Sequence, residues 1–263
     1  MNRKNQPKSI FAEILLPIIV VLGFLFVWQI SIMVGIIPHN KMATPIEVFS
    51  TFLVKLHDTA PDGATLQENI LQSLKISLSG LFMGIFIGTP LGLLMGWYKK
   101  VDMVVKPIFE LFRPIPPIAW IPLTILWIGV GDFAKICIIF VSAFIPCVLN
   151  SQAGIRQTSP VLINMAKTFG ATDFETFLRI GVPSSIPMIF AGVRIALGNA
   201  WSTLVAAELL AANAGLGYMI TMGRQYQRID IIVLGMVTIG LLGFVITWGF
   251  EKLEKHVMKW KVD

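Results

Sequence analysis

Long stretches without a charged residue limit what this chain can fold into more than any other feature. Five segments of about 18 residues or more contain no Asp, Glu, Lys or Arg; they are 14–40, 76–98, 114–131, 136–155 and 231–250. A helix of that length crosses a bilayer core of roughly 30 Å. A sixth segment, 184–207, is interrupted by a single charge, Arg194. The sequence therefore predicts an all-α membrane protein with six transmembrane helices.

The composition agrees with a membrane location. The chain is 55% hydrophobic and 14% charged, whereas a soluble domain carries roughly 25% charged residues. The first apolar segment is longer than the roughly 7–15 residues of a signal-peptide core, and no Ala-x-Ala-like cleavage site ends it. We interpret it as a retained transmembrane helix.

The basic residues are distributed by membrane side. With the N-terminus inside, predicted cytoplasmic segments hold 14 of them: Arg3, Lys4, Lys8, Lys99, Lys100, Lys106, Arg113, Arg156, Lys167, Arg179, Lys252, Lys255, Lys259 and Lys261. Predicted outer loops hold 5: Lys41, Lys55, Lys135, Arg224 and Arg228. The positive-inside rule therefore predicts that both termini are cytoplasmic. The net charge of +6 is thus interpreted as a sign of membrane orientation and does not indicate binding of nucleic acid.

Two segments near the second and third apolar stretches have unusual composition. Glycines recur every fourth residue over 80–96, which predicts a face for close helix packing; a pore lining is the alternative. Segment 113–122 contains four prolines, which lack an amide proton and disfavour an ordinary helix. Such broken backbone either lines a watery pathway or forms an interfacial entry loop. Residues 99–102 are expected to form a short cytoplasmic connection.

Local turn signals describe the outer loop over 38–69. Pro61-Asp62-Gly63 predicts a turn, and Thr44-Pro45 predicts the start of a short helix. Cys137 and Cys147 fall in one predicted helix about 15 Å apart, too far for a disulfide. Neither metal-ligand spacing nor a catalytic constellation is found in the sequence, so we expect no catalytic and no metal site.

A short cytoplasmic hairpin is predicted between the fourth and fifth spans. Ser159-Pro160 predicts a helix start, and Gly170 predicts its end. The sequence Thr172-Asp173-Phe174-Glu175 spells a capping box for a second helix, which we expect to finish before Pro183. Apolar residues on the hairpin suit docking into a groove of a partner protein; packing under its own bundle is the alternative. They are Val161, Leu162, Met165, Phe169, Phe174, Phe177 and Leu178.

The spacing within this hairpin resembles the EAA loop of ABC-importer permeases, E-A-A-x3-G-x9-I-x-L-P. Gly170, Ile180 and Pro183 stand at the family spacing, Ala166 takes the second alanine position, and Val182 replaces Leu. Asn164 replaces the Glu and Met165 the first Ala. The resemblance implies that the hairpin couples the permease to an ATPase. The residues it assigns to coupling are Asn164, Met165, Ala166, Phe169, Gly170, Ile180 and Pro183.

The resemblance extends over about 71–261. Within the ABC-importer permeases, the chain resembles the nitrate/sulfonate/taurine branch. Segments 113–122, 126–129, 201–209 and 215–218 look closest to those of taurine permeases. The resemblance implies a type I ABC-importer permease fold, with an N-terminal part over 1–69 and a five-helix core over 70–263. It further implies a bacterial inner-membrane location and a solute that is a small anion or zwitterion, with taurine or another alkanesulfonate as the best candidate.

The resemblance also implies partners in the lipid bilayer and on both sides of it. They are a second permease copy forming a homodimer, two cytoplasmic ATPase subunits and an extracytoplasmic binding protein. No GxxxxGK[ST] motif occurs in the sequence, so ATP and Mg are expected on the ATPase subunits and no cofactor in this chain.

Candidate residues for the solute pathway lie in the fifth span. Arg194 and Glu208 are 14 residues apart, about 21 Å along a helix, and are not expected to pair. Arg194 either attracts an anion or extends its side chain to the membrane–water interface. Glu208 either faces the pathway or binds the loop around Gly215 and Gly217. We hypothesise that Trp201 and Glu208 form an outer gate. Polar residues nearby are Asn199, Ser202 and Thr203.

Three other functions remain as alternatives to a taurine importer. The same kind of importer can carry nitrate or another small solute. A self-contained secondary carrier is the second, but such carriers usually show inverted repeats and intramembrane acids, of which the sequence gives no clear sign. A membrane enzyme is the third, and it needs a constellation of His, Asp or Cys. Sensitivity to an uncoupler favours the carrier, and a strict need for an ATPase favours the importer.

Overall fold

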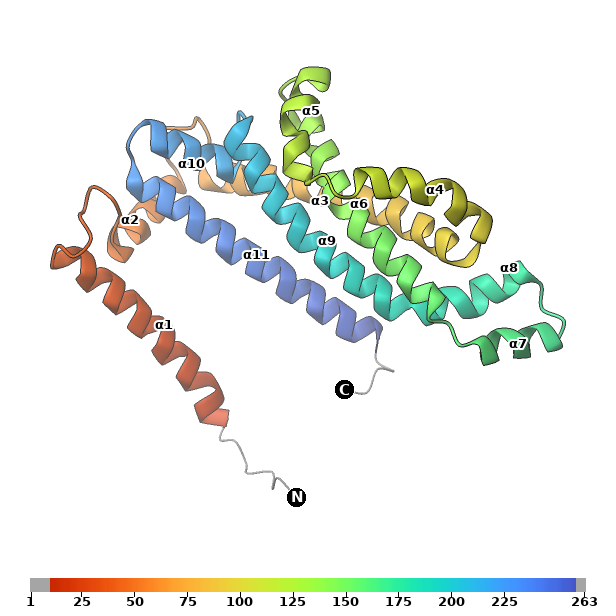
Figure 1. Cartoon of the computed structure of the whole chain (residues 1–263). Helices are drawn as coiled ribbons and strands as arrows, with labels where there is room; N and C mark the ends of the chain where they lie inside the picture. Colours follow the sequence, from red (N-terminus) through yellow and green to blue (C-terminus); the bar gives the residue numbers. More distant parts are fainter. Residues whose placement is uncertain (1–9, 259–263) are drawn as a thin grey trace.

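The computed structural model describes residues 10–258, and these residues form helices joined by short loops, without a strand (Figure 1). The α-helices are α1 Ile10–Met33, α2 Pro45–Lys55, α3 Leu66–Trp97, α4 Lys99–Phe112, α5 Ile121–Ile128, α6 Asp132–Arg156, α7 Pro160–Thr168, α8 Asp173–Thr176, α9 Val182–Leu210, α10 Leu216–Gln225 and α11 Ile229–Val257. A 3₁₀ turn, η1 Pro117–Trp120, precedes α5, and a π-helical turn, η2 Phe177–Gly181, joins α8 to α9.

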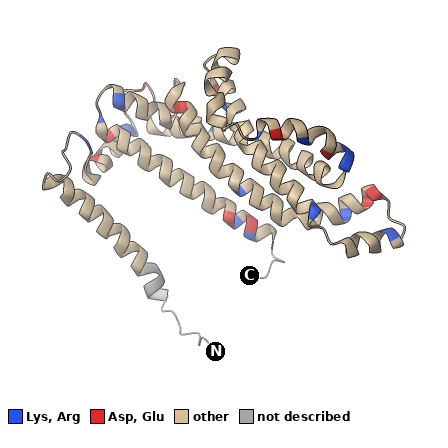
Figure 2. Cartoon of the chain, viewed as in Figure 1, with Lys and Arg blue, Asp and Glu red and all other residues tan. Residues whose placement is uncertain are grey.

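Five helical segments are long and apolar enough to cross a membrane: Leu15–Met33, Leu66–Trp97, Asp132–Arg156, Asp173–Leu210 and Ile229–Val257. The bent pair Lys99–Phe112 and Pro117–Ile128 makes a sixth if it counts as one span. Charged residues gather near the helix ends and along α4, while α9 and α11 are uncharged over most of their length (Figure 2). The predicted all-α membrane fold is confirmed.

The third span differs from its prediction. Segment 114–131 is not one helix, because α4 ends at Phe112 and the chain bends by 79° before η1 and α5. The physical reason is the run of prolines, which removes amide donors at consecutive turns. Residues 99–102 are also not a loop, since α4 begins at Lys99.

The glycine stripe of α3 packs against α6, as predicted. A Cβ added at Gly84 would lie 2.6 Å from Ala143 Cβ, and one added at Gly92 would lie 2.3 Å from Val148 O. Only glycine permits so close an approach of two backbones in lipid. The stripe is therefore a packing face, and its glycines do not line a pore.

On its other side, α6 packs against α9, so α3, α6 and α9 form the centre of the bundle (Figure 1). Ile139 and Ala143 of α6 are buried there with Ala196, Ala200 and Leu204 of α9. Cys147 is buried in the same cluster, and both cysteines are free thiols. The cluster consists of small and branched apolar side chains, which keeps the three helices close together.

The outer loop is held by a buried ion pair. Lys55 Nζ lies 2.5 Å from Asp62 Oδ1 and also donates to the carbonyls of Ala60 and Ala64, so all three of its protons are used. The other Asp62 oxygen accepts from Asn69 Nδ2 of α3 at 2.6 Å. The helix predicted after Thr44 is confirmed as α2, which begins with a capping box between Thr44 and Glu47.

Helix α1 stands away from the bundle and meets the rest of the chain at α2 (Figure 1). Most of its apolar side chains are exposed. The basic residues Arg3, Lys4, Lys8, Lys259 and Lys261, on which the predicted sidedness partly depends, lie outside the described residues.

Candidate functional site

The predicted hairpin is formed by α7, α8 and η2, and we call residues 159–181 the hairpin. Helix α7 ends at Thr168 and is followed by the C-cap residue Phe169 and by Gly170, whose φ of 81° lies in the left-handed region that favours glycine. The amide of Gly170 donates to Lys167 O and that of Ala171 donates to Ala166 O. These two bonds are the Schellman arrangement that satisfies the last carbonyls of a helix.

The second half of the hairpin begins as predicted and ends differently. Thr172 and Glu175 form the capping box, with Thr172 N 2.9 Å from Glu175 Oε2 and Glu175 N 3.2 Å from Thr172 Oγ1. The prediction that this helix stops before Pro183 is wrong. The chain passes through the π-helical turn directly into α9, because Pro183 stands in the first turn, where no amide donor is required.

One side of the hairpin is fixed to the end of α3. Phe177 is buried with its ring centroid 5.7 Å from that of Trp97, and Trp97 Nε1 donates to Asp173 Oδ2 at 3.2 Å. A Cβ on Gly181 would lie 2.9 Å from the Trp97 ring. Phe177, predicted as part of the exposed apolar face, thus anchors the hairpin to the bundle.

The opposite side of the hairpin is free of the bundle. Helix α7 contains no buried residue, and Phe169 at its end is 85% exposed. The hairpin projects beyond the end of the bundle (Figure 1), so it does not pack under its own helices. A cavity of about 320 Å³ lies between its two arms. Its lining is Ala166, Phe169, Gly170, Ala171, Glu175, Thr176, Arg179 and Ile180.

The residues assigned to coupling divide into two groups by exposure. Asn164 and Met165 lie exposed on α7, as does Pro183 at the start of α9. Ala166 and Ile180 are half-buried, and both line the cavity between the arms. The structure thus brings most of these residues to one projecting element.

The candidate pathway residues of α9 do not share one environment. Arg194 forms an ion pair with Glu254 of α11, while Asn199 and Ser202 are exposed on α9. Trp201 is buried against α11, where its Nε1 donates to Ile239 O at 3.2 Å. Trp201 therefore links two helices, and the structure does not bring it together with Asn199 and Ser202.

Glu208 lies in a buried network at the end of the bundle opposite the hairpin. Its two oxygens accept from Ser73 Oγ and from the Gly217 amide, each at 2.8 Å. Asn69 Oδ1 accepts from the Gly215 amide at 2.9 Å. The carboxylate thus binds the loop between α9 and α10. Sequence reasoning missed Asn69 and Ser73, whose only signal is their place as polar residues on the apolar helix α3.

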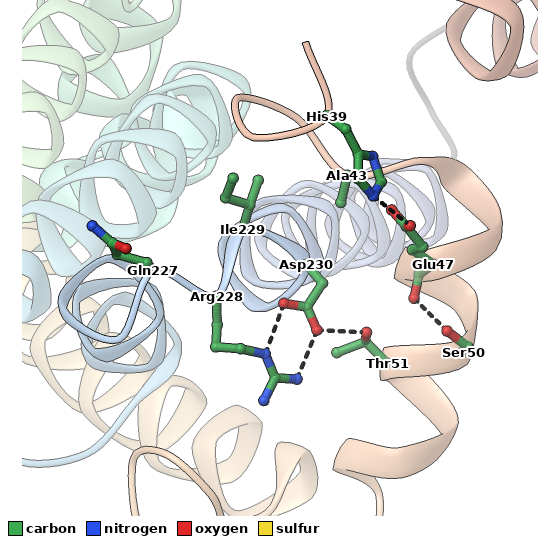
Figure 3. A pocket seen from close by; sticks show the side chains of 9 residues that line it. All are labelled: His39, Ala43, Glu47, Ser50, Thr51, Gln227, Arg228, Ile229 and Asp230. Atoms are coloured by element: carbon green, nitrogen blue, oxygen red, sulfur yellow. Dashed lines mark hydrogen bonds and ion pairs between the residues drawn. The ribbon is translucent and has the colours of Figure 1, made fainter. Parts of the chain in front are cut away.

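A polar cavity of about 390 Å³ opens between α2 and the α10–α11 loop at this same end (Figure 3). Arg228 donates twice to Asp230, and Thr51 Oγ1 donates to the same carboxylate at 2.8 Å. The hydrogen bonds to Asp230 raise the pKa of the Arg228 guanidinium above its ordinary value. Across the cavity, His39 Nε2 lies 3.0 Å from Glu47 Oε1.

A bundle of long apolar helices with an exposed apolar hairpin at one end suits a membrane protein that docks to a partner. The chain belongs to the family of inner-membrane components of binding-protein-dependent transport systems, whose sequence profile matches residues 80–259. It is therefore a multi-pass inner-membrane subunit of an ABC-type importer.

Relatives cover nearly the whole chain. A putative ABC transporter permease of Methanocaldococcus jannaschii is 34% identical over 98% of this chain and 95% of its own length. The taurine transport system permease of Escherichia coli is 32% identical, covering 90% and 86%. The bicarbonate transport system permease of Synechocystis is 30% identical, covering 93% and 89%.

A solved structure shows the same fold. A crystal structure of an amino acid ABC transporter with histidines matches with a TM-score of 0.58 at 15% identity. The match covers 82% of this chain and 96% of that chain. The similarity agrees with the type I importer fold.

Proposed function

We propose that this chain forms the translocation path of an ABC importer for a small organic anion or zwitterion, with taurine or another alkanesulfonate as the best candidate. The observation that carries the proposal is the hairpin, which is anchored to α3 at one side and presents exposed apolar residues at the other. The names of the taurine and bicarbonate permeases support a small anionic solute.

The energy for transport comes from a separate chain. Two ATPase subunits bind ATP and Mg and receive the hairpin through Asn164, Met165, Ala166, Phe169 and Gly170, while Ile180 and Pro183 hold its second arm. A second copy of this chain completes the path as a homodimer. Nucleotide binding then alternates the access of the path between the two membrane sides.

The two ends of the bundle have different tasks under this proposal. The hairpin end and both termini are cytoplasmic, and an extracytoplasmic binding protein delivers solute to the end that holds α2 and α10. Residues 1–69 form an N-terminal anchor and outer loop, and residues 70–263 form the core. Arg194, Asn199 and Ser202 line the path, whereas Trp201 and Glu208 keep the outer end of α9 in position.

Uptake of labelled taurine tests the function. Cells express this chain with or without its ATPase and binding-protein partners. We expect uptake that requires both partners and ATP and that survives an uncoupler of the proton gradient. Uptake by this chain alone would show a secondary carrier and overturn the proposal. If the complete system moves bicarbonate or nitrate but no sulfonate, the importer stands and the solute is reassigned.

A further inference from the structure

Arg113 lies beside the middle of the candidate span α6, although its sequence context predicts a cytoplasmic position. Helix α4 runs antiparallel to α6, because Asp102 binds Gln152 and Arg156 while Phe109 packs on Phe144. Phe144 is the central residue of α6. Arg113 follows Phe109 by four residues, about 6 Å. Because α6 is a candidate membrane span, we infer that Arg113 lies inside a hydrocarbon core of roughly 30 Å.

Helix α4 carries a charged stripe at this depth. Lys106, Glu110 and Arg113 follow each other at helical spacing and are exposed in the single chain. The stripe lies beside an apolar face formed by Met103, Val104, Ile108 and Leu111. A charged side chain in lipid is costly, and those found within the membrane usually face a bundle interior or water. We therefore expect the stripe to face water or protein, and not lipid, in the assembled transporter.

A cavity of about 230 Å³ adjoins Arg113, and we call it the Arg113 cavity. Its lining is Phe109, Phe112, Arg113, Trp120, Phe140, Val141, Phe144 and Ile145. Apart from the guanidinium, the polar group in this lining is the indole N–H of Trp120. That nitrogen is buried, and no atom of the described residues accepts its hydrogen bond. A buried donor without an acceptor indicates that a group absent from the single chain accepts its hydrogen bond.

The broken backbone beside the cavity gives a second, independent indication. The chain leaves helical geometry between Phe112 and Pro117. At membrane depth, non-helical backbone is tolerated only where protein covers it or where it lines a watery cavity. The side chains of this segment are largely exposed in the single chain, so they face the second copy or the water of the path.

We propose that Arg113 and the Trp120 indole N–H bind the oxyanion group of the solute halfway along the path. This inference rests on the proposed import of a small anion and names its binding site. Glu110 lies 3.4 Å from Arg113 through both carboxylate oxygens, longer than a strong charge-assisted bond. The guanidinium has five N–H donors, so it retains donors for a sulfonate or carboxylate. The phenylalanine rings enclose the short carbon chain of the solute.

Thiol labelling tests the charge and hydration of this site without transport. Cys137 and Cys147 are replaced by Ala, and Phe112→Cys places a thiol on the cavity wall in the assembled transporter. We expect a methanethiosulfonate reagent carrying a sulfonate to react about tenfold faster than one carrying an ammonium group, because one is attracted and the other repelled. Arg113→Gln should remove the preference. A thiol inert to both reagents, or equal rates with Arg113 present, would overturn the proposal.

Transport by matched variants gives the second test. Arg113→Gln and Trp120→Phe should each lower uptake of labelled taurine by at least about tenfold, while Trp127→Phe, 71% exposed on α5 outside the cavity, should leave it unchanged. Co-purification with the ATPase shows that each variant assembles. If the wild type imports sulfonates and both variants match it, the inference is wrong. If the wild type imports none yet the labelling preference is present, the site stands and the solute proposed above fails.

Discussion

At the scale of single residues, Gly170 shows how one backbone angle sets the direction of the hairpin. A Cβ at Gly170 would touch nothing, so Gly170→Ala adds strain only through its φ of 81°. We expect this substitution to cost about 1–2 kcal/mol of folding free energy. It should redirect the second arm and lower solute-stimulated ATP hydrolysis by the complex. Gly249→Ala in α11 is the matched control, since a Cβ there also meets nothing within a regular helix. Equal ATPase rates for the two variants would contradict the role of Gly170.

The surroundings of Glu208 allow a structural role to be distinguished from a role in the solute path. Glu208→Gln keeps the shape of the side chain but turns one acceptor into a donor, which then faces the Gly217 amide or the Ser73 hydroxyl. We expect a loss of about 1–3 kcal/mol, seen as a lower midpoint of thermal unfolding in detergent. Glu251→Gln, a carboxylate outside this network, should change the midpoint little. An unchanged midpoint with lost uptake would instead place Glu208 in the path.

At the scale of elements, the α3–α6 contact depends on the absence of side chains. Gly92→Ala puts a Cβ 2.3 Å from the backbone oxygen of Val148, which cannot move without displacing α6. We expect destabilisation of about 1–3 kcal/mol from overpacking. The thermal midpoint of the purified protein measures this effect. Gly240→Ala in α11 introduces the same methyl into open space and should not lower the midpoint.

Elements defined by local signals were predictable, and elements defined by distant contacts were not. Gly170 and the Thr172–Glu175 capping box end and begin helices through bonds to near neighbours, so the sequence predicts the hairpin. Pro183 is ambiguous in the sequence, because a proline equally begins a helix and ends the preceding one. The partners of Glu208 include Ser73, 135 residues away, and no short-range pattern identifies such a contact. The position of Arg113 beside the middle of α6 depends on how α4 packs against α6, which the neighbouring residues in the sequence do not indicate.

At the scale of the whole molecule, we expect the hairpin to be the part of this chain that joins a larger assembly. Phe169→Ala removes the most exposed aromatic ring of the hairpin. We expect it to weaken binding of the ATPase subunit by about 2 kcal/mol, roughly 30-fold, measured by co-purification or titration of the detergent-solubilised complex. Phe49→Ala, an exposed ring on α2 at the other end, is the control. Equal affinity for both variants would contradict docking through the hairpin.

Helix α8, the π-helical turn and α9 follow one another without a loop, so Asp173–Leu210 is one helical segment of 38 residues, about 57 Å of helix measured along its path. Trp97 contacts this segment near its first end, through Phe177 and Asp173, so we expect the hairpin to move about this contact. Near the other end of the segment lies Glu208, which accepts hydrogen bonds from Ser73 and Gly217. We expect a displacement of the hairpin to be transmitted along this segment and to strain the hydrogen bonds of Glu208 first. Opening on one side of the membrane would then be tied to movement on the other through a single continuous backbone.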